Sequence, residues 1–198
     1  KLFLTHLHLD HVGDFHVLYD AMVWGREAPL SVWGPSGYTP EMGPAAFVEH
    51  RVAAARWHTE SKIGIGPSGG MRTEVSEFDF GGLSPDNPQV LVYEKDGVRI
   101  SAFPVVHCIY GAVGYRLEWN GLSLSFHGDG TPSRFEAEQA AGVDLFMHEG
   151  FVDPQTFAEN ASIPLRVTQS IVGEHTTGDR FGELCQIVRP RMAVAYHY

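Results

Sequence analysis

The segment from Thr5 to Asp14 carries the residues best suited to chemistry. It contains the pattern His-x-His-x-Asp-His, formed by His6, His8, Asp10 and His11. With 11 His among 198 residues, we expect only about 0.002 chance occurrences of this spacing. Residues i and i+2 at the end of a strand project together, so we expect His6 and His8 to hold one metal ion and the next two residues to reach a second. Imidazole and carboxylate ligands suit Zn²⁺, with Mn²⁺ or Fe as alternatives. The competing interpretation of the motif is a solvated polar loop that binds no metal.

Strands and helices alternate around this motif, which predicts an α/β chain with one domain over residues 1–198. The chain starts and stops on apolar, strand-like segments, so we expect a piece of a longer polypeptide. The expected elements are strands at Lys1–Thr5, Leu30–Trp33, Val143–Met147 and Arg191–Tyr198, hairpins at Val90–Phe103 and Gly114–Phe126, and helices at Pro40–Trp57, from Ser133 to about Gly142 and from about Thr177 to Pro190.

Composition excludes several classes of protein. A hydrophobic content of 43% with 19% charged residues predicts a folded core. The net charge of −10 disfavours a broad nucleic-acid-binding face. Two cysteines are too few for a disulfide framework. The sequence has no apolar run of about 18 residues, so it predicts no membrane span. The compartment stays open between cytoplasm and periplasm.

At this motif the chain resembles the metallo-β-lactamase superfamily. The resemblance implies the αββα sandwich of that family, here lacking its N-terminal strands. It also implies His107, which follows the strand Ile100–Val106, as the third ligand of the first metal, Asp129 as the bridge and His197 as the last ligand. Taken singly, these residues are better explained as core histidines and a turn aspartate, and only as an ordered set after the first motif do they indicate ligands. We expect Cys108 to point away from His107 and to serve in packing.

Three further motifs narrow the branch of the family. Val106-His107, followed by Gly114-Tyr-Arg116, is similar to tRNase Z and to related phosphodiesterases and arylsulfatases. His148-Glu149 resembles the His-Glu-Ala-Thr motif of tRNase Z, and His175-Thr-Thr177 resembles its His-Ser-Thr motif. In those enzymes the Glu orients the His, which gives a proton to the leaving oxygen. The resemblance therefore implies Glu149 and His175 as catalytic residues.

The resulting hypothesis is a dinuclear hydrolase of a phosphodiester or a similar small ester. The resemblance implies two divalent ions, Zn²⁺ first, and attack by a hydroxide that bridges them, with Asp10 orienting the nucleophile. We expect the chain to act on a small-molecule ester rather than on nucleic acid, and we expect no association with a membrane. Whether the protein forms a homodimer is left open.

Three alternatives remain open. A tRNA 3′-end endonuclease would need a basic arm, and the Gly64–Gly70 loop has only Lys62 and Arg72 beside it. A lactonase-like or arylsulfatase-like enzyme and a non-hydrolytic member of the fold are the other two.

Overall fold

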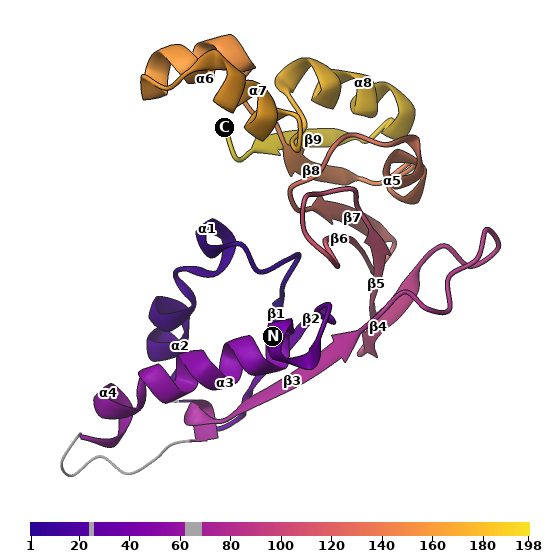
Figure 1. Ribbon diagram of the computed structural model, residues 1–198. Coiled ribbons are helices and arrows are strands. Elements are labelled where there is room, and N and C mark those ends of the chain that lie inside the picture. The colour runs from indigo at the N-terminus through magenta and orange to yellow at the C-terminus, as the bar shows by residue number, and fades with distance from the viewer. Residues whose placement is uncertain (24–25, 62–68) are drawn as a thin grey trace. The chain divides into compact units, whose positions relative to one another are not determined.

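The protein is described by a computed structural model that covers residues 1–23, 26–61 and 69–198 (Figure 1). Its contacts divide the chain into two compact units, Lys1–Asp79 and Phe80–Tyr198. The expected loop from Gly64 lies, up to residue 68, outside the described residues. No helix among the described residues is long and apolar enough to cross a bilayer.

The first unit is built on a parallel three-stranded sheet in the order β1-β2-β3. Its strands are β1 (Leu2–Phe3), β2 (Leu30–Pro35) and β3 (Thr73–Phe78). The α-helices are α1 (Leu9–Val12), α2 (Phe15–Val23), α3 (Pro44–Ala54) and α4 (Arg56–Glu60), and the 3₁₀ turns are η1 (Pro40–Met42) and η2 (Gly69–Met71).

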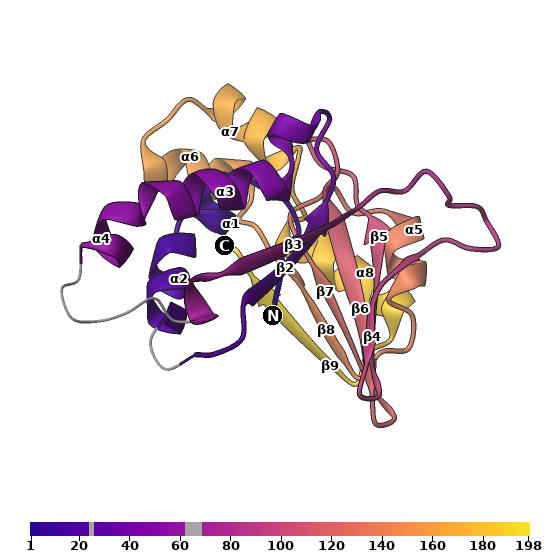
Figure 2. The same cartoon turned by 90° about the horizontal axis from the view of Figure 1, so that it is seen from below.

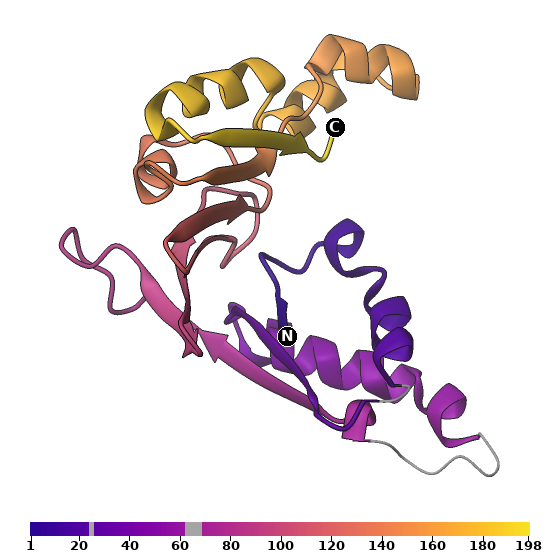
Figure 3. The same ribbon diagram turned by 180° about the vertical axis from the view of Figure 1, so that it is seen from behind.

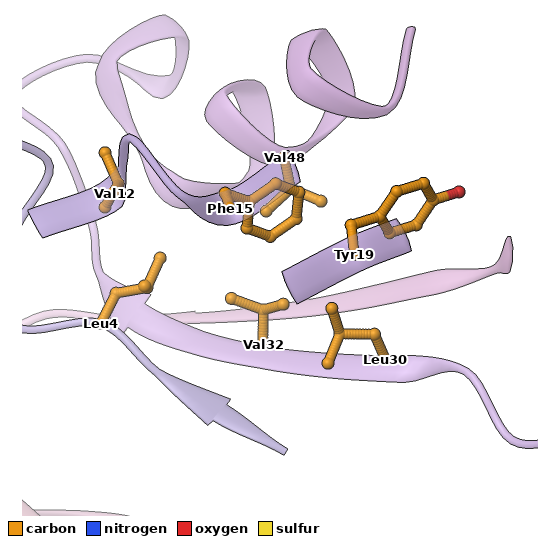
Figure 4. Close-up of a cluster of buried hydrophobic side chains, with 7 residues drawn as sticks. All are labelled: Leu4, Val12, Phe15, Tyr19, Leu30, Val32 and Val48. Atoms are coloured by element: carbon orange, nitrogen blue, oxygen red, sulfur yellow. The ribbon is translucent and has the colours of Figure 1, made fainter. Parts of the chain in front are cut away.

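The core of the first unit fixes the start of the metal motif. Leu30 and Val32 alternate on β2 and are fully buried, as a half-buried strand requires. They pack with Leu4, just before the motif, and with Val12 at its end, as Figure 4 shows. Tyr19 adds a hydrogen bond from its hydroxyl to the Met71 carbonyl at 2.8 Å, which ties α2 to η2. The motif is therefore held at both ends by apolar packing.

The second unit contains a six-stranded sheet in the order β4-β5-β6-β7-β8-β9, visible side by side in Figure 2. The first four strands form an antiparallel meander, and β7, β8 and β9 are parallel. The strands are β4 (Val90–Lys95), β5 (Val98–Pro104), β6 (Val113–Trp119), β7 (Leu122–His127), β8 (Leu145–Glu149) and β9 (Met192–Tyr196).

Helices connect the parallel strands of this sheet, because parallel neighbours need a crossover. They are α5 (Arg134–Gln139), α6 (Pro154–Ala161), α7 (Leu165–Val172) and α8 (Gly178–Val188). Phe146 on β8 packs with Leu184 and Val188 on α8 and with Ala137 on α5. Both helices thus cover one face of the sheet, as the rear view of Figure 3 also shows for α8.

Most of the predicted elements are confirmed. Both hairpins form, with Asp96 and Asn120 at positive φ in their turns, and Ser133 caps α5 through a reciprocal capping box with Glu136. The prediction of one helix over Pro40–Trp57 is wrong. Pro44 begins α3 after Gly43 in extended conformation, since a proline is favoured in the first turn and lacks the amide that a continuing helix needs.

Candidate functional site

The His motif forms a compact turn in the first unit. His6 is almost fully buried, and its ring centroid lies 4.8 Å from that of His8 and 4.2 Å from that of His11. His8 is the N-cap of the one-turn helix α1, which carries Asp10 and His11. The Nε2 of His11 lies 3.5 Å from Oδ2 of Asp10. The structure therefore brings the three imidazoles of the motif together, with a carboxylate at their side.

The second unit gathers the other candidate residues at one edge of its sheet. The strands β5, β7, β8 and β9 run in the same direction, so their carboxyl ends share this edge. His107 follows β5, Asp129 follows β7, Glu149 ends β8 and His197 follows β9. Donor atoms of Asp129, Glu149, His175 and His197 all lie within 4.8 Å of one another.

Glu149 is the centre of this group. Its Oε1 accepts hydrogen bonds from the amides of Gly130 (2.7 Å) and Thr176 (3.0 Å), and its Oε2 lies 2.7 Å from Nδ1 of His175. Burial raises the pKa of Glu149, but the hydrogen bonds from His175, His197 and Gly130 outweigh this and lower the pKa to about 2. Because an ionised carboxylate only accepts, Nδ1 of His175 carries the hydrogen.

The ring of His175 is held in place by stacking as well. The Phe151 ring lies parallel to it, with centroids 4.5 Å apart at 16°. Nδ1 of His175 is also 3.7 Å from Oδ2 of Asp129. With Nδ1 committed to Glu149, the Nε2 of His175 is the ring atom left to act on a substrate.

His197 and Asp129 lie side by side. Nδ1 of His197 is 3.5 Å from Oδ1 of Asp129 and 3.5 Å from Oε2 of Glu149. His197 has a positive φ of 58°, a conformation that is uncommon for a residue with a side chain and that clusters at functional sites. The Tyr196 hydroxyl donates to the His127 carbonyl, which ties the end of β9 to the end of β7.

His107 is oriented by a residue that sequence reasoning missed. Its Nδ1 donates to the backbone carbonyl of Glu174 at 3.1 Å, so in the neutral ring the lone pair is on Nε2. The prediction for Cys108 is wrong. It lies in a bend after β5 rather than on a strand, its side chain is exposed, and its Sγ is 3.7 Å from Nε2 of His107.

A pocket of about 420 Å³ opens beside His175 in the second unit. Thr131, Thr177 and Arg180 bring hydroxyl and guanidinium groups to its lining, and Pro132 and Val172 bring apolar surface. The sequence contains no signal for this pocket, because its walls come from the Asp129 loop, α7 and the start of α8. The pocket is large enough for a small ester.

Comparisons with known proteins give a consistent result. A ribonuclease Z of Mycolicibacterium paratuberculosis is 31% identical over 157 residues, which covers 74% of this chain and 50% of that protein. Among solved structures, human tRNase Z, short form, has a TM-score of 0.67 at 16% identity and covers 98% of this chain and 70% of that one. The metallo-β-lactamase fold protein YhfI from Bacillus subtilis has a TM-score of 0.54 at 14% identity and covers 100% of this chain and 67% of that one. The chain has the metallo-β-lactamase fold.

This assignment confirms the predicted fold class, with two sheets and their helices in a mixed α/β chain. The chain spans about half the length of the curated relatives it matches. No family model matches it. Its sequence similarity to ribonuclease Z agrees with the branch indicated by the motifs around His107, Glu149 and His175.

Proposed function

We propose that this chain carries the active site of a metal-dependent hydrolase that cleaves a phosphodiester or a similar ester. The observation that carries the proposal is the 2.7 Å hydrogen bond between His175 and a fully buried Glu149, beside Asp129. A histidine that is hydrogen-bonded to a carboxylate is suited to act as a general acid, because the carboxylate stabilises the protonated ring. The similarity to ribonuclease Z supports the same class of reaction.

The donor groups fit divalent metal ions. All of them are imidazoles or carboxylates, the donors of zinc hydrolase sites. The Nδ1–H of His107 donates a hydrogen bond to a backbone carbonyl, as in ligating histidines. We propose the ligand set that the motif and the family resemblance imply: His6, His8 and His107 for one ion, Asp10, His11 and His197 for a second, and Asp129 for both. Zn²⁺ is the ion of first choice.

The bound ions would supply a Lewis acid and an activated water. The chain's own residues would do the rest. His175 gives the proton on Nε2 to the leaving oxygen, and Glu149 holds the ring by accepting from Nδ1 and stabilises the charge on it. Phe151 keeps the plane of the ring fixed. Asp10, which is exposed at the edge of the motif, orients the nucleophile.

The test is the variant His175→Ala on two substrates of one class. On an alkyl phosphodiester, whose leaving group needs a proton, we expect kcat to fall about 10²–10⁴-fold. On a nitrophenyl phosphodiester we expect a much smaller loss, because nitrophenolate departs without a proton. The metal content should equal that of the unmodified chain. Equal losses on both substrates, or loss of metal, would contradict the proposed role.

A second candidate is cleavage of precursor tRNA, which the similarity to ribonuclease Z favours. The net charge of −10 argues for a small substrate instead. Direct assay of precursor tRNA beside nitrophenyl phosphodiesters, phosphomonoesters, sulfates and lactones separates the two. Efficient tRNA cleavage would establish the second candidate.

A further inference from the structure

A second group of metal-type donors lies inside the second unit, on the face of the sheet covered by α5 and α8. His127 ends β7, His148 lies on β8, and Glu136 comes from α5. All three side chains are buried, with at most 1% of any side chain exposed. The group is separate from Glu149, because His148 and Glu149 are neighbours on one strand and their side chains point to opposite faces.

The hydrogen bonds around His148 fix which of its nitrogens carries the hydrogen. Its Nδ1 lies 3.0 Å from the carbonyl oxygen of Glu149, and a carbonyl can only accept. Nδ1 is therefore the donor. In the neutral ring Nε2 then bears a lone pair, and this atom lies 3.7 Å from Oε1 of Glu136.

His127 is fixed in the same way. The hydroxyl of Ser125 donates to the Tyr115 carbonyl at 3.3 Å, so its oxygen accepts from Nε2 of His127 at 2.9 Å. The lone pair of His127 is therefore on Nδ1, which lies 3.9 Å from Oε2 of Glu136. Three acceptors thus converge in one buried place.

Among the described residues, three of these acceptor atoms have no hydrogen-bond donor, whereas the other oxygen of Glu136, Oε1, accepts from the amide of Ser133 at 2.8 Å. Nδ1 of His127, Nε2 of His148 and Oε2 of Glu136 are buried and make no hydrogen bond. The surroundings are apolar, since the rings of Phe103 and Phe146 lie against these histidines. A buried carboxylate facing two lone pairs is strongly unfavourable unless a cation lies between them.

The distances favour a metal ion over a shared proton. A charge-assisted hydrogen bond between His and Glu is about 2.7–2.9 Å long, as for His175 and Glu149 in the same unit at 2.7 Å. The contacts of Glu136 are about 1 Å longer. Two ligand atoms bound to one tetrahedral zinc at about 2.0–2.1 Å are about 3.3–3.4 Å apart, so small shifts would close the group around an ion.

We propose that His127, Glu136 and His148 form a buried structural site for one divalent transition-metal ion of the zinc class. The ligand atoms are Nδ1 of His127, Nε2 of His148 and the Glu136 carboxylate, and the Ser125 hydroxyl and the Glu149 carbonyl hold the two rings. The ion ties α5 to β7 and β8. The site is additional to the catalytic ligands and does not depend on the proposed reaction.

The test counts metal in chains that lack the motif histidines. In a His6→Ala/His8→Ala/His11→Ala background, we compare Glu136→Gln with Glu138→Gln after a chelator wash, by mass spectrometry of the metal. Glu138 is the matched control, because it lies on the same helix, is about half exposed and pairs with Arg134. We expect the Glu138 variant to keep one more zinc per chain than the Glu136 variant. Equal zinc in both would overturn the proposal.

A second measurement needs no substitution. Anomalous diffraction at the zinc edge, on the unmodified chain loaded with zinc, should show a peak among the three side chains with zinc–nitrogen distances of about 2.0–2.1 Å. This decides the case even where Glu136→Gln prevents folding. A map without that peak, in which Glu136 hydrogen-bonds a histidine at about 2.7–2.9 Å, would identify a shared proton and overturn the proposal.

Discussion

The substitution Glu149→Gln isolates the link between Glu149 and His175. The amide keeps an oxygen at the position of Oε1, so it still accepts from Gly130 and Thr176 and the loop before α8 stays in place. At the position of Oε2 an NH₂ group replaces an acceptor. The hydrogen on Nδ1 of His175 then loses its partner, and the ring turns to the other tautomer.

The magnitude follows from the lost hydrogen bond. A bond of 2.7 Å from a ring N–H to a buried carboxylate belongs to the charge-assisted class, which contributes about 1.5–3 kcal/mol. With about 1.4 kcal/mol for each factor of ten, the loss of this bond corresponds to a factor of about 10–150. We expect kcat on an alkyl phosphodiester to fall by about that factor, and kcat on a nitrophenyl phosphodiester to change little.

The assay compares Glu149→Gln with Glu138→Gln, the same change at a half-exposed position on α5. Steady-state kcat is measured on both substrates, together with metal content and circular dichroism. The control should match the unmodified chain. If Glu149→Gln lowered kcat equally on both substrates, or released metal at constant fold, Glu149 would be a ligand or a structural residue and the reasoning would be refuted.

Three further predictions concern packing, metal and substrate. Gly114→Ala should lower the free energy of unfolding by about 1–3 kcal/mol in urea denaturation, because its Cβ would lie 2.5 Å from Cε2 of Phe103. A Cβ at Gly182 in α8 would meet nothing within 4 Å, so Gly182→Ala should instead raise the free energy of unfolding by about 0.5–1 kcal/mol. A change of the same sign for both variants would show that the space around the added methyl group does not determine their stability. Chelation should abolish hydrolysis and added Zn²⁺ should restore it, whereas activity that survives complete metal removal would exclude the metal mechanism. Between low and moderate salt, kcat/KM on a small phosphodiester should change only a few-fold, and a steep salt dependence would indicate a substrate that contacts the chain through many phosphates.

Much of the secondary structure could be predicted from local sequence patterns. The turns at Asp96-Gly97 and Asn120-Gly121, the capping box at Ser133 and the apolar alternation of the strands depend on neighbours in the chain, so they could be read directly. The sequence analysis missed β3, α1, α2, α6 and α7, although α6 has a clear local start signal in the N-cap Asp153 followed by Pro154. Tertiary contacts hold three of them: α2 buries Phe15 and Tyr19 in the first core, α7 buries Val172, and β3 pairs with β2.

The sequence by itself predicted a metal site, because His6, His8, Asp10 and His11 lie within six residues and their spacing needs only one turn to converge. Resemblance extended this to Glu149 and His175. Only the tertiary structure decided that these two residues, 26 positions apart, share a 2.7 Å hydrogen bond, and that the Glu174 carbonyl orients His107. It also decided that His127, Glu136 and His148 meet in a buried place. Such contacts depend on which strand lies beside which and on the face to which each side chain points, and neither is a property of neighbouring residues in the chain.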